Sequence, residues 1–184
     1  MDALHPTLWR TCRVLANEKR LQLLWKLFQS GESSVTSLGD AVGLTEPGAS
    51  AYLRALNARG LILPRREKTF VYYRVESNPE VAGAPELLEG LKGAYDAFMP
   101  LGHVMKQLTA FTHERRIAIV RALAESSMEE SALSVKAGIS PQALYRHVRK
   151  LRERGYVERA DQKVFLVDQE NPLGKVLLSL ALSS

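Results

Sequence analysis

The sequence contains a single cysteine and no long apolar run. One cysteine, Cys12, excludes an internal disulfide and a cysteine-rich metal site, and it is compatible with a reducing compartment. No run of about 18 apolar residues occurs, and the first residues lack the basic-then-apolar order of a secretory signal. We therefore expect a soluble, cytoplasmic protein that makes no use of a membrane.

The motifs of several enzyme classes are also missing. There is no glycine-rich phosphate loop and no Gly-x-Ser-x-Gly nucleophile motif. Residues 113–117 begin like a zinc-protease helix, but Ile117 stands where the second histidine is required. The four histidines have no helical metal spacing between them. We expect no enzymatic activity, no cofactor and no bound metal.

The composition is that of a mildly basic globular protein. The 184 residues carry a net charge of +5, and 46% of them are hydrophobic, enough to build a core. A basic balance favours an acidic partner such as nucleic acid, although the signal is weak by itself. The length allows one large domain or two of about 90 residues.

An internal repeat decides between these two organisations. Residues 17–21 (Asn-Glu-Lys-Arg-Leu) return as residues 113–117 (His-Glu-Arg-Arg-Ile). At an offset of 95, residues 42–63 and 137–158 are identical at five of 22 positions, which in the first copy are Gly43, Arg54, Leu56, Arg59 and Gly60. Such a register indicates two copies of one small module.

Capping residues predict three helices in the first copy. Asn17 begins a helix that ends at Gly31, Ser34 begins a short helix that stops at Gly43, and Thr45 begins a third that breaks at Gly60. The β-branched and aromatic stretch 69–75 predicts a strand. With residues 61–63, and with 65–68 as a charged turn, it forms a hairpin.

The second copy repeats this order. Thr112 opens its first helix, Ser126 with Glu129 predicts a capping box for the next, and Ser140 begins a third that ends at Gly155. Residues 156–158 and 163–167 predict a shorter hairpin. The expected fold is mainly α (α+β): tandem winged helix-turn-helix modules, each of three helices and a β-hairpin wing. We place the first module at 1–85, connecting helices at 86–111 and the second module at 112–184.

These residues resemble the ArsR family of bacterial winged-helix repressors. The resemblance covers the core of both halves: the opening stretch 16–24, the turn 43–50, and the wing end 71–75 (Val-Tyr-Tyr-Arg-Val). The second half also keeps the family's histidine, at His147. Metal-sensing members have a Cys-x-Cys pair near the second helix, whereas residues 33–40 contain no cysteine. Members are usually single modules that dimerise, whereas this chain carries two.

The resemblance implies binding to double-stranded DNA. The third helix of each module would enter the major groove, where arginine and glutamine read base edges. In the first module the expected face holds Thr45, Glu46, Gly48, Ala49, Ser50, Tyr52 and Arg54. In the second it holds Ser140, Gln142, Ala143, Tyr145, Arg146, Arg149 and Lys150. The expected wing contacts are Arg65, Arg66, Lys68, Arg159 and Lys163.

Charge is distributed differently in the two modules. Residues 141–154 carry a net charge of +4, whereas residues 46–59 carry +1. The wings show the reverse, +3 in the first and zero in the second. If both modules bind DNA, the first therefore grips it mainly by its wing and the second mainly by its helix; alternatively, only one module binds.

Apolar stripes at helical spacing lie outside the modules. They begin at Leu4, Leu87, Leu101 and Leu173, and Cys12 falls on the first of them as a core residue. ArsR-like proteins dimerise through flanking helices of this kind. The stripes therefore predict an intrachain pseudo-dimer, or additionally a true homodimer, and the sequence leaves both open.

The favoured function is a sequence-specific transcriptional regulator, most simply a repressor, with an unidentified small-molecule inducer compatible with it. The alternative is a protein–protein adaptor without specific DNA binding, such as the tandem winged-helix partner of bacterial condensin. Those adaptors are acidic, so the basic balance of this chain argues against the alternative.

Overall fold

The structure is a computed structural model and describes residues 7–183; Leu4, placed above on the first apolar stripe, lies outside them. The first part of the chain forms α1 (Leu8–Leu15), α2 (Glu18–Ser30), β1 (Glu32–Ser34), α3 (Val35–Val42), α4 (Glu46–Asn57), β2 (Leu63–Glu67), β3 (Phe70–Arg74) and α5 (Ala84–Asp96). The rest forms α6 (Leu101–Ala110), α7 (Glu114–Leu123), β4 (Met128–Glu129), α8 (Glu130–Ala137), α9 (Pro141–Glu153), β5 (Val157–Ala160), β6 (Lys163–Leu166) and α10 (Pro172–Ser183).

The same order of elements occurs in both parts. We call α2–β3 (18–74) the first unit and α7–β6 (114–166) the second unit. Each has three helices and a three-stranded antiparallel sheet, ordered β1-β3-β2 in one and β4-β6-β5 in the other. The fold is mainly helical with small antiparallel sheets, which is compatible with a winged helix-turn-helix. The short strands β1 and β4, which the sequence analysis missed, each add one edge to a wing.

Two of the side-chain caps predicted in the first unit are confirmed, whereas Thr45 takes the N-cap position without a capping hydrogen bond. The Asn17 side chain accepts a hydrogen bond from the backbone N–H of Arg20, and Ser34 accepts one from Ser37. Gly43 ends α3 in the left-handed conformation, which glycine adopts without a steric cost. The cap at Ser34 and the helix end at Gly43 define α3 and leave a tight turn between it and α4.

Two predicted helix starts in the second unit are wrong. Ser126 does not cap α8, because Met128 and Glu129 extend as β4 along β6 and the helix begins only at Glu130. The cap of α7 is His113 rather than Thr112, since the His113 Nδ1 accepts from the backbone N–H of Arg115.

The charged segment 65–68 is not a loop. Arg65, Arg66 and Glu67 continue β2 and pair with β3, so the turn consists of Lys68 and Thr69 alone. Lys68 takes a positive φ of 55° there. The wing is consequently longer than predicted, and its basic side chains alternate between the two faces of a strand.

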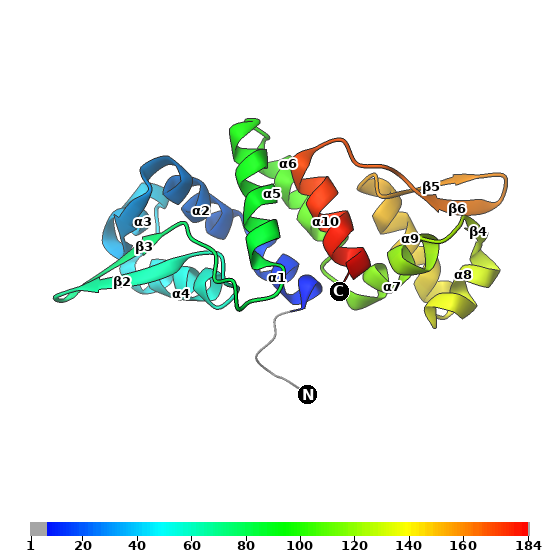
Figure 1. Cartoon of the computed structure of the whole chain (residues 1–184), viewed down its shortest axis with the longest axis horizontal. Coiled ribbons are helices and arrows are strands. Elements are labelled where there is room, and N and C mark those ends of the chain that lie inside the picture. Colours follow the sequence, from blue (N-terminus) through cyan, green and yellow to red (C-terminus); the bar gives the residue numbers. More distant parts are fainter. Residues whose placement is uncertain (1–6, 184) are drawn as a thin grey trace.

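Four central helices, α1, α5, α6 and α10, separate the two units, which lie at opposite ends of the molecule (Figure 1). Helices α5 and α10 run antiparallel, because Gly83 approaches Leu180, Gly90 approaches Val176 and Gly93 approaches Pro172. Without side chains on these glycines, the two helix backbones come close together.

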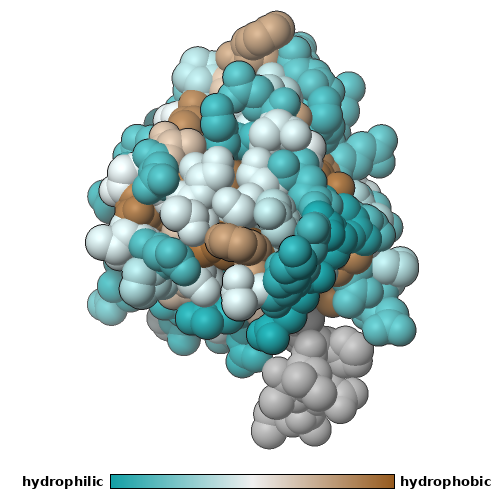
Figure 2. Space-filling model, turned by 90° about the vertical axis from the view of Figure 1, so that its left-hand side faces the viewer, coloured by the Kyte–Doolittle hydropathy of each residue, from teal (hydrophilic) through white to brown (hydrophobic). Residues whose placement is uncertain are grey.

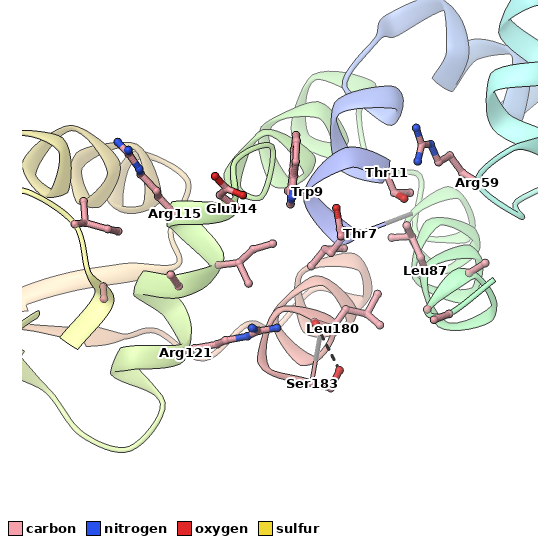
Figure 3. Close-up of a pocket in the computed structure, with 18 of the residues that line it drawn as sticks. Thr7, Trp9, Thr11, Arg59, Leu87, Glu114, Arg115, Arg121, Leu180 and Ser183 are labelled. Atoms are coloured by element: carbon pink, nitrogen blue, oxygen red, sulfur yellow. Dashed lines mark hydrogen bonds between the residues drawn. The ribbon is translucent and has the colours of Figure 1, made fainter. Parts of the chain in front are cut away.

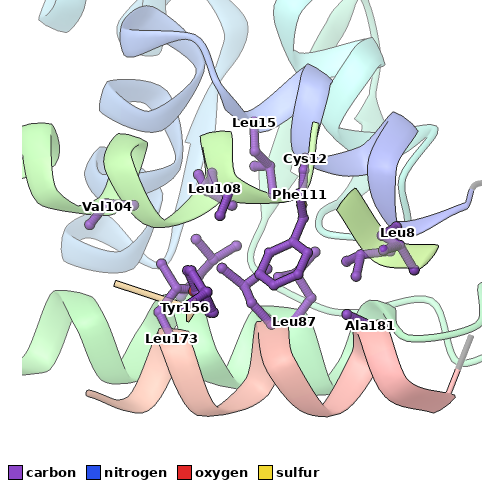
Figure 4. Close-up of a cluster of buried hydrophobic side chains, with 14 of the residues drawn as sticks. Leu8, Cys12, Leu15, Leu87, Val104, Leu108, Phe111, Tyr156, Leu173 and Ala181 are labelled. Atoms are coloured by element: carbon purple, nitrogen blue, oxygen red, sulfur yellow. The ribbon is translucent and has the colours of Figure 1, made fainter. Parts of the chain in front are cut away.

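Residues of the central helices and of both units form one continuous apolar core, part of which Figure 4 shows. Cys12 on α1 is fully buried in it, as the sequence predicted. Phe111 and Tyr156 meet edge to face with ring centroids 4.7 Å apart, and the Tyr156 hydroxyl donates to Oε1 of Gln107. Tyr156 thus joins the second unit to α6 by both packing and a hydrogen bond.

A histidine pair joins α7 to α9. The rings of His113 and His147 have centroids 4.6 Å apart. Burial is the main cause that lowers the pKa of His147 to about 4, and the nearby positive charge of His113, Arg116, Arg115 and Arg146 adds to it. The folded protein therefore holds His147 neutral at pH values above about 4.

We expect Gly90→Leu to lower the free energy of unfolding by about 1–3 kcal/mol. A Cβ on Gly90 would lie 3.0 Å from the Cβ of Val176, whose β-branched side chain has one preferred helical rotamer and cannot turn away. Chemical denaturation measures the change. Gly102→Leu is the matched control, because nothing lies within 4 Å of that position. Equal stability of the two variants would show that the α5–α10 contact is not tightly packed.

We expect the stability of the protein to fall as the pH drops from about 6.5 toward about 4. Over that range the unfolded chain binds a proton on His147 that the folded chain does not, and proton uptake by the unfolded state lowers stability. Denaturation of wild type and His147→Gln across this range isolates the contribution. The difference in unfolding free energy between the two should change within the window and stay constant above pH of about 7; a pH-independent difference contradicts the assignment.

Candidate nucleic-acid interface

Equivalent turns position α4 and α9. In the first unit the backbone N–H of Leu44 donates to the carbonyl of Gly39 over 2.9 Å, and in the second Ile139 donates to Ser134 over 3.0 Å. Thr45 and Ser140 occupy the N-cap positions of the two helices, and neither hydroxyl makes a capping hydrogen bond. Both hydroxyls, and the unpaired N–H groups of each first turn, are therefore available to an anionic partner.

The exposed face of α4 is small. Thr45, Glu46 and Arg54 are exposed, and Gly48, Ser50 and Tyr52 are partly buried. Ala49 is fully buried, so its predicted place on the groove face is wrong: it packs inward beside Gly39. The Arg20 guanidinium lies 4.9 Å from the centre of the Tyr52 ring, which ties this tyrosine to α2.

The exposed face of α9 is larger and more basic. The residues predicted there that are exposed are Ser140, Gln142, Tyr145, Arg146, Arg149 and Lys150. Ala143 is 3% exposed and belongs to the core, so its predicted place on this face is also wrong. Tyr145 is 53% exposed, a large aromatic surface for a helix without a partner.

The 95-residue register explains the difference between the two helices. Ser50 and Ala51 of α4 correspond to Tyr145 and Arg146 of α9. The first helix therefore offers a surface that a partner can approach closely, and the second projects an aromatic ring and a guanidinium.

Ion pairs reduce the basic surface that the sequence suggested for α9. Near its C-terminal end, Arg149 lies 3.7 Å from a Glu153 carboxylate oxygen and Arg152 lies 3.9 Å from Glu158. Within residues 7–183, Arg146 and Lys150 form no ion pair. These two cations are the ones that α9 keeps available to a partner.

Hydrophilic side chains cover much of the end of the molecule that the first unit forms (Figure 2), and the first wing contributes the exposed residues Arg65, Arg66, Glu67 and Lys68. Arg65 is paired with Glu32 on β1 and with Glu67 on its own strand. Hydrogen bonds to Glu32 and Glu67 raise the pKa of Arg65, and the hydrogen bond from Arg65 is the main cause that lowers the pKa of Glu32. Arg66 and Lys68 make no ion pair within the described part of the chain, so they supply the accessible charge of this wing.

The second wing is more nearly neutralised. Arg159 forms an ion pair with Glu130 at the start of α8. Lys163 lies opposite Glu129 in the β4–β6 register. The sequence analysis missed Glu32 and Glu130 as partners, because each lies some 30 residues from its arginine and no periodicity joins them.

A groove of about 590 Å³ separates α4 from the first wing. Predicted site residues Ser50, Arg54 and Arg66 line it. It also contains residues that the sequence analysis did not select: Thr36, Asn57 and Phe70. Phe70 is 57% exposed near the wing tip; its place beside a basic strand was the one sequence signal that could have identified it.

Two other kinds of site were sought in residues 7–183. No helix there is long and apolar enough to span a membrane. Nor do three or more His, Cys, Asp or Glu side chains come together there as a metal-binding group.

Comparisons with known proteins agree with this geometry. Residues 113–159 match the family model described as bacterial regulatory protein, arsR family. The chain is 44% identical to the HTH-type transcriptional regulator Rv0324 of Mycobacterium tuberculosis over 66 residues, 36% of this chain and 29% of that protein. It is 35% identical to the arsenical resistance operon repressor of Escherichia coli over 63 residues, 34% of this chain and 54% of that protein.

The transcriptional activator HlyU of Vibrio cholerae is 37% identical over 79 residues, 43% of this chain and 71% of that protein. The chain thus spans less than two thirds of the first two relatives and more than two thirds of the third. All three are named as regulators of transcription, one of them as a repressor and one as an activator. With the match to the family model over the second unit, these relatives show that the chain belongs to the arsR family of bacterial regulatory proteins.

Proposed function

We propose that the protein is a sequence-specific DNA-binding transcriptional regulator that uses α4 and α9 as its two recognition helices. The observation that carries the proposal is the exposed face of α9, on which the side chains of Arg146 and Tyr145 lie in solvent. At the start of the same helix, the hydroxyl of Ser140 makes no capping hydrogen bond. A helix of this kind fits the major groove with its N-terminal side chains at base edges.

Each side chain on α9 has a role that follows from its chemistry. Arg146 and Gln142 can each make two hydrogen bonds to one base, which gives sequence discrimination. Lys150 and the Ser140 hydroxyl suit phosphate oxygens, which set the position of the helix on the duplex. Arg149 adds a further phosphate contact once it leaves Glu153, an exposed partner that holds it weakly.

The first unit makes a different contribution. With Thr45, Gly48, Ser50 and Arg54, α4 has few long side chains for base edges. Arg66 and Lys68 on the long β2–β3 wing can instead neutralise phosphates without reading sequence. Arg65, Arg159 and Lys163 are secondary contacts, because acidic side chains already lie beside them.

We further propose that the chain is a tandem repeat whose modules form an intrachain pseudo-dimer. The repeated order of elements and of strands supports this, as does the antiparallel packing of α5 on α10 between the units. The domain division at 1–85, 86–111 and 112–184 belongs to the same proposal. Within it, α5 follows the first wing as α10 follows the second. A homodimer of the whole chain remains compatible with this arrangement.

The proposed pseudo-dimer implies an asymmetric operator. Paired helix-turn-helix units read half-sites about one DNA turn apart, and identical units read a palindrome. Here the two recognition helices carry different side chains at corresponding positions. The preferred site is therefore an imperfect palindrome or two unlike half-sites.

We propose that the protein acts as a repressor, as the name of its Escherichia coli relative states for that protein. The Vibrio cholerae relative is an activator. A reporter fused to the chain's own upstream DNA distinguishes the two: deletion of the gene should raise expression, and a fall would reverse the assignment.

We expect Arg146→Ala to weaken binding to the cognate DNA by about 1–3 kcal/mol and to relax base preference in one half-site. The reason is the loss of a bidentate base contact that only the correct base can satisfy. Fluorescence anisotropy with cognate and scrambled duplexes measures both effects. Lys106→Ala, which removes one exposed charge from α6, is the control and should bind like wild type. Equal binding of cognate and scrambled DNA by the wild type would favour the adaptor alternative.

We expect Arg66→Ala with Lys68→Ala to weaken binding to all sequences alike. The dependence of log affinity on log salt should become shallower by about 1.8, because two phosphate contacts are lost at about 0.9 each. Arg65→Ala should have a smaller effect, since Glu32 and Glu67 already neutralise that arginine. A salt series with each variant makes the comparison. An unchanged slope in the double variant would remove the wing from the interface.

A further inference from the structure

A cavity of about 680 Å³ lies between the two units, against the central helices. Its walls come from α1, α5, α7, the end of α8 and the end of α10 (Figure 3). A volume of this size is typical of sites for small organic molecules.

Most of the lining is apolar. Leu8, Leu87, Ile117 and Ile139 form part of it and belong to the buried core, and Leu180 lies beside them. An apolar molecule in this space would therefore be removed from water against side chains that belong to the packed core.

Basic groups outnumber acidic ones at the cavity. Arg59, Arg115 and Arg121 line it, against Glu114 alone. Arg59 and Arg121 approach the space from opposite sides (Figure 3). The Arg121 Nε already donates to the carbonyl of Ala181 over 2.9 Å, which leaves Arg59 as the better candidate for a ligand.

The side chain of Arg59 has an unsatisfied hydrogen-bond donor. Its Nε is buried and has no hydrogen-bond partner within the described residues. Burial, with the nearby charge of Arg10, lowers the pKa of Arg59. In the 95-residue register Arg59 corresponds to Arg154, whose Nε donates to Thr109 over 2.8 Å. Arg154 thus has a partner on the central helix α6, whereas Arg59 lies at the edge of a cavity without one for its Nε.

The cavity also contacts the elements that carry the two recognition helices. Arg59 lies two residues beyond the end of α4. Ala137, Gly138 and Ile139 lead directly into Ser140, the N-cap of α9. A molecule that touches both would constrain the position of one helix relative to the other.

We propose that this cavity is the effector site of the protein and that it takes a small organic anion, an apolar body that carries one carboxylate or sulfonate. Arg59 binds the anionic end, and the wall around Leu87, Ile117 and Leu180 holds the apolar body. Occupancy changes the affinity for DNA by fixing the relative position of α4 and α9. Only this last step rests on the proposed function.

Binding is tested with anilinonaphthalene sulfonate, an apolar anion whose fluorescence rises in apolar surroundings. We expect one equivalent to bind the folded protein. Naphthaleneacetate should displace it. The uncharged naphthaleneacetamide should require a concentration about tenfold higher or more for the same displacement, because a hydrogen bond between charged groups is lost. Equal displacement by both would overturn the anionic specificity.

Three variants locate the site, each first shown to be folded by circular dichroism. Ala118→Trp fills the cavity from α7 and should weaken probe binding by about tenfold or more. Arg59→Met should weaken it by about tenfold through the lost charge, whereas Arg13→Met, an arginine outside the lining, should leave it unchanged. Normal probe binding by folded Ala118→Trp would place the probe elsewhere and overturn the proposal.

A competing possibility is that residues 1–6 of the chain fill the cavity instead of a ligand. A variant that begins at Thr7 tests it. Unchanged probe affinity is expected. A gain of about tenfold or more would mean that this segment occupies the cavity and would overturn the ligand assignment.

Coupling is measured separately, by DNA binding with and without saturating naphthaleneacetate. We expect the dissociation constant for DNA to change by about fivefold or more, and Ala118→Trp to abolish the response. If the wild type binds no DNA while the probe still follows the variants, the regulator proposal fails and the ligand site stands. If the protein binds DNA with the same dissociation constant whether or not naphthaleneacetate is present, the effector role fails and the regulator proposal stands.

Discussion

The antiparallel contact between α5 and α10 is the constraint on which the rest of the molecule depends. Each unit is small, and its sheet has only three short strands, so it has little apolar surface to bury by itself. The two helices come close because glycines on α5 face Val176 and Pro172 on α10. Their contact brings the apolar faces of α1 and α6 into one core, and that core sets the position of both units.

For the proposed binding to DNA, the spacing between the two units matters because DNA presents its half-sites at a fixed distance. In a homodimer the spacing is set by an interface that forms and dissociates with concentration. In the proposed pseudo-dimer both halves lie on one chain, so the spacing does not depend on concentration. The two halves are also free to carry different residues, and Ser50 with Ala51 against Tyr145 with Arg146 is such a difference.

The two copies also differ at an arginine that borders the cavity. Arg59 and Arg154 occupy corresponding positions after their helices, yet only Arg154 finds a hydroxyl, that of Thr109, for its Nε. The buried Nε of Arg59 lacks a hydrogen bond, which lowers stability, but the side chain as a whole is only partly buried. In the proposed site the anion meets the outer nitrogens of this guanidinium. In the proposed tandem arrangement, corresponding arginines therefore have different roles, structural for Arg154 and ligand-binding for Arg59.

Much of the fold could be predicted from the sequence because its signals are local. Asn17, Ser34, Gly43 and Gly138 specify helix ends through hydrogen bonds and φ angles within a few residues of themselves. The strands β1 and β4 were missed because two or three residues carry no periodicity, and only pairing with β3 and β6 makes them strands. The error at Ser126 has the same cause, since that pairing delays the start of α8.

The features of the candidate site also divide into those that depend on local sequence and those that depend on tertiary packing. The sequence by itself located the helices α4 and α9 and the presence of a hairpin after each, and the exposure of Tyr145 and Arg146 follows from their helical positions. Only the tertiary structure decided that Arg65 and Arg159 are neutralised by Glu32 and Glu130, that Ala49 and Ala143 point inward, and that Arg59 borders a cavity. Helix position depends on hydrogen bonds between near neighbours, whereas ion pairs and cavities depend on the packing of residues far apart in the chain.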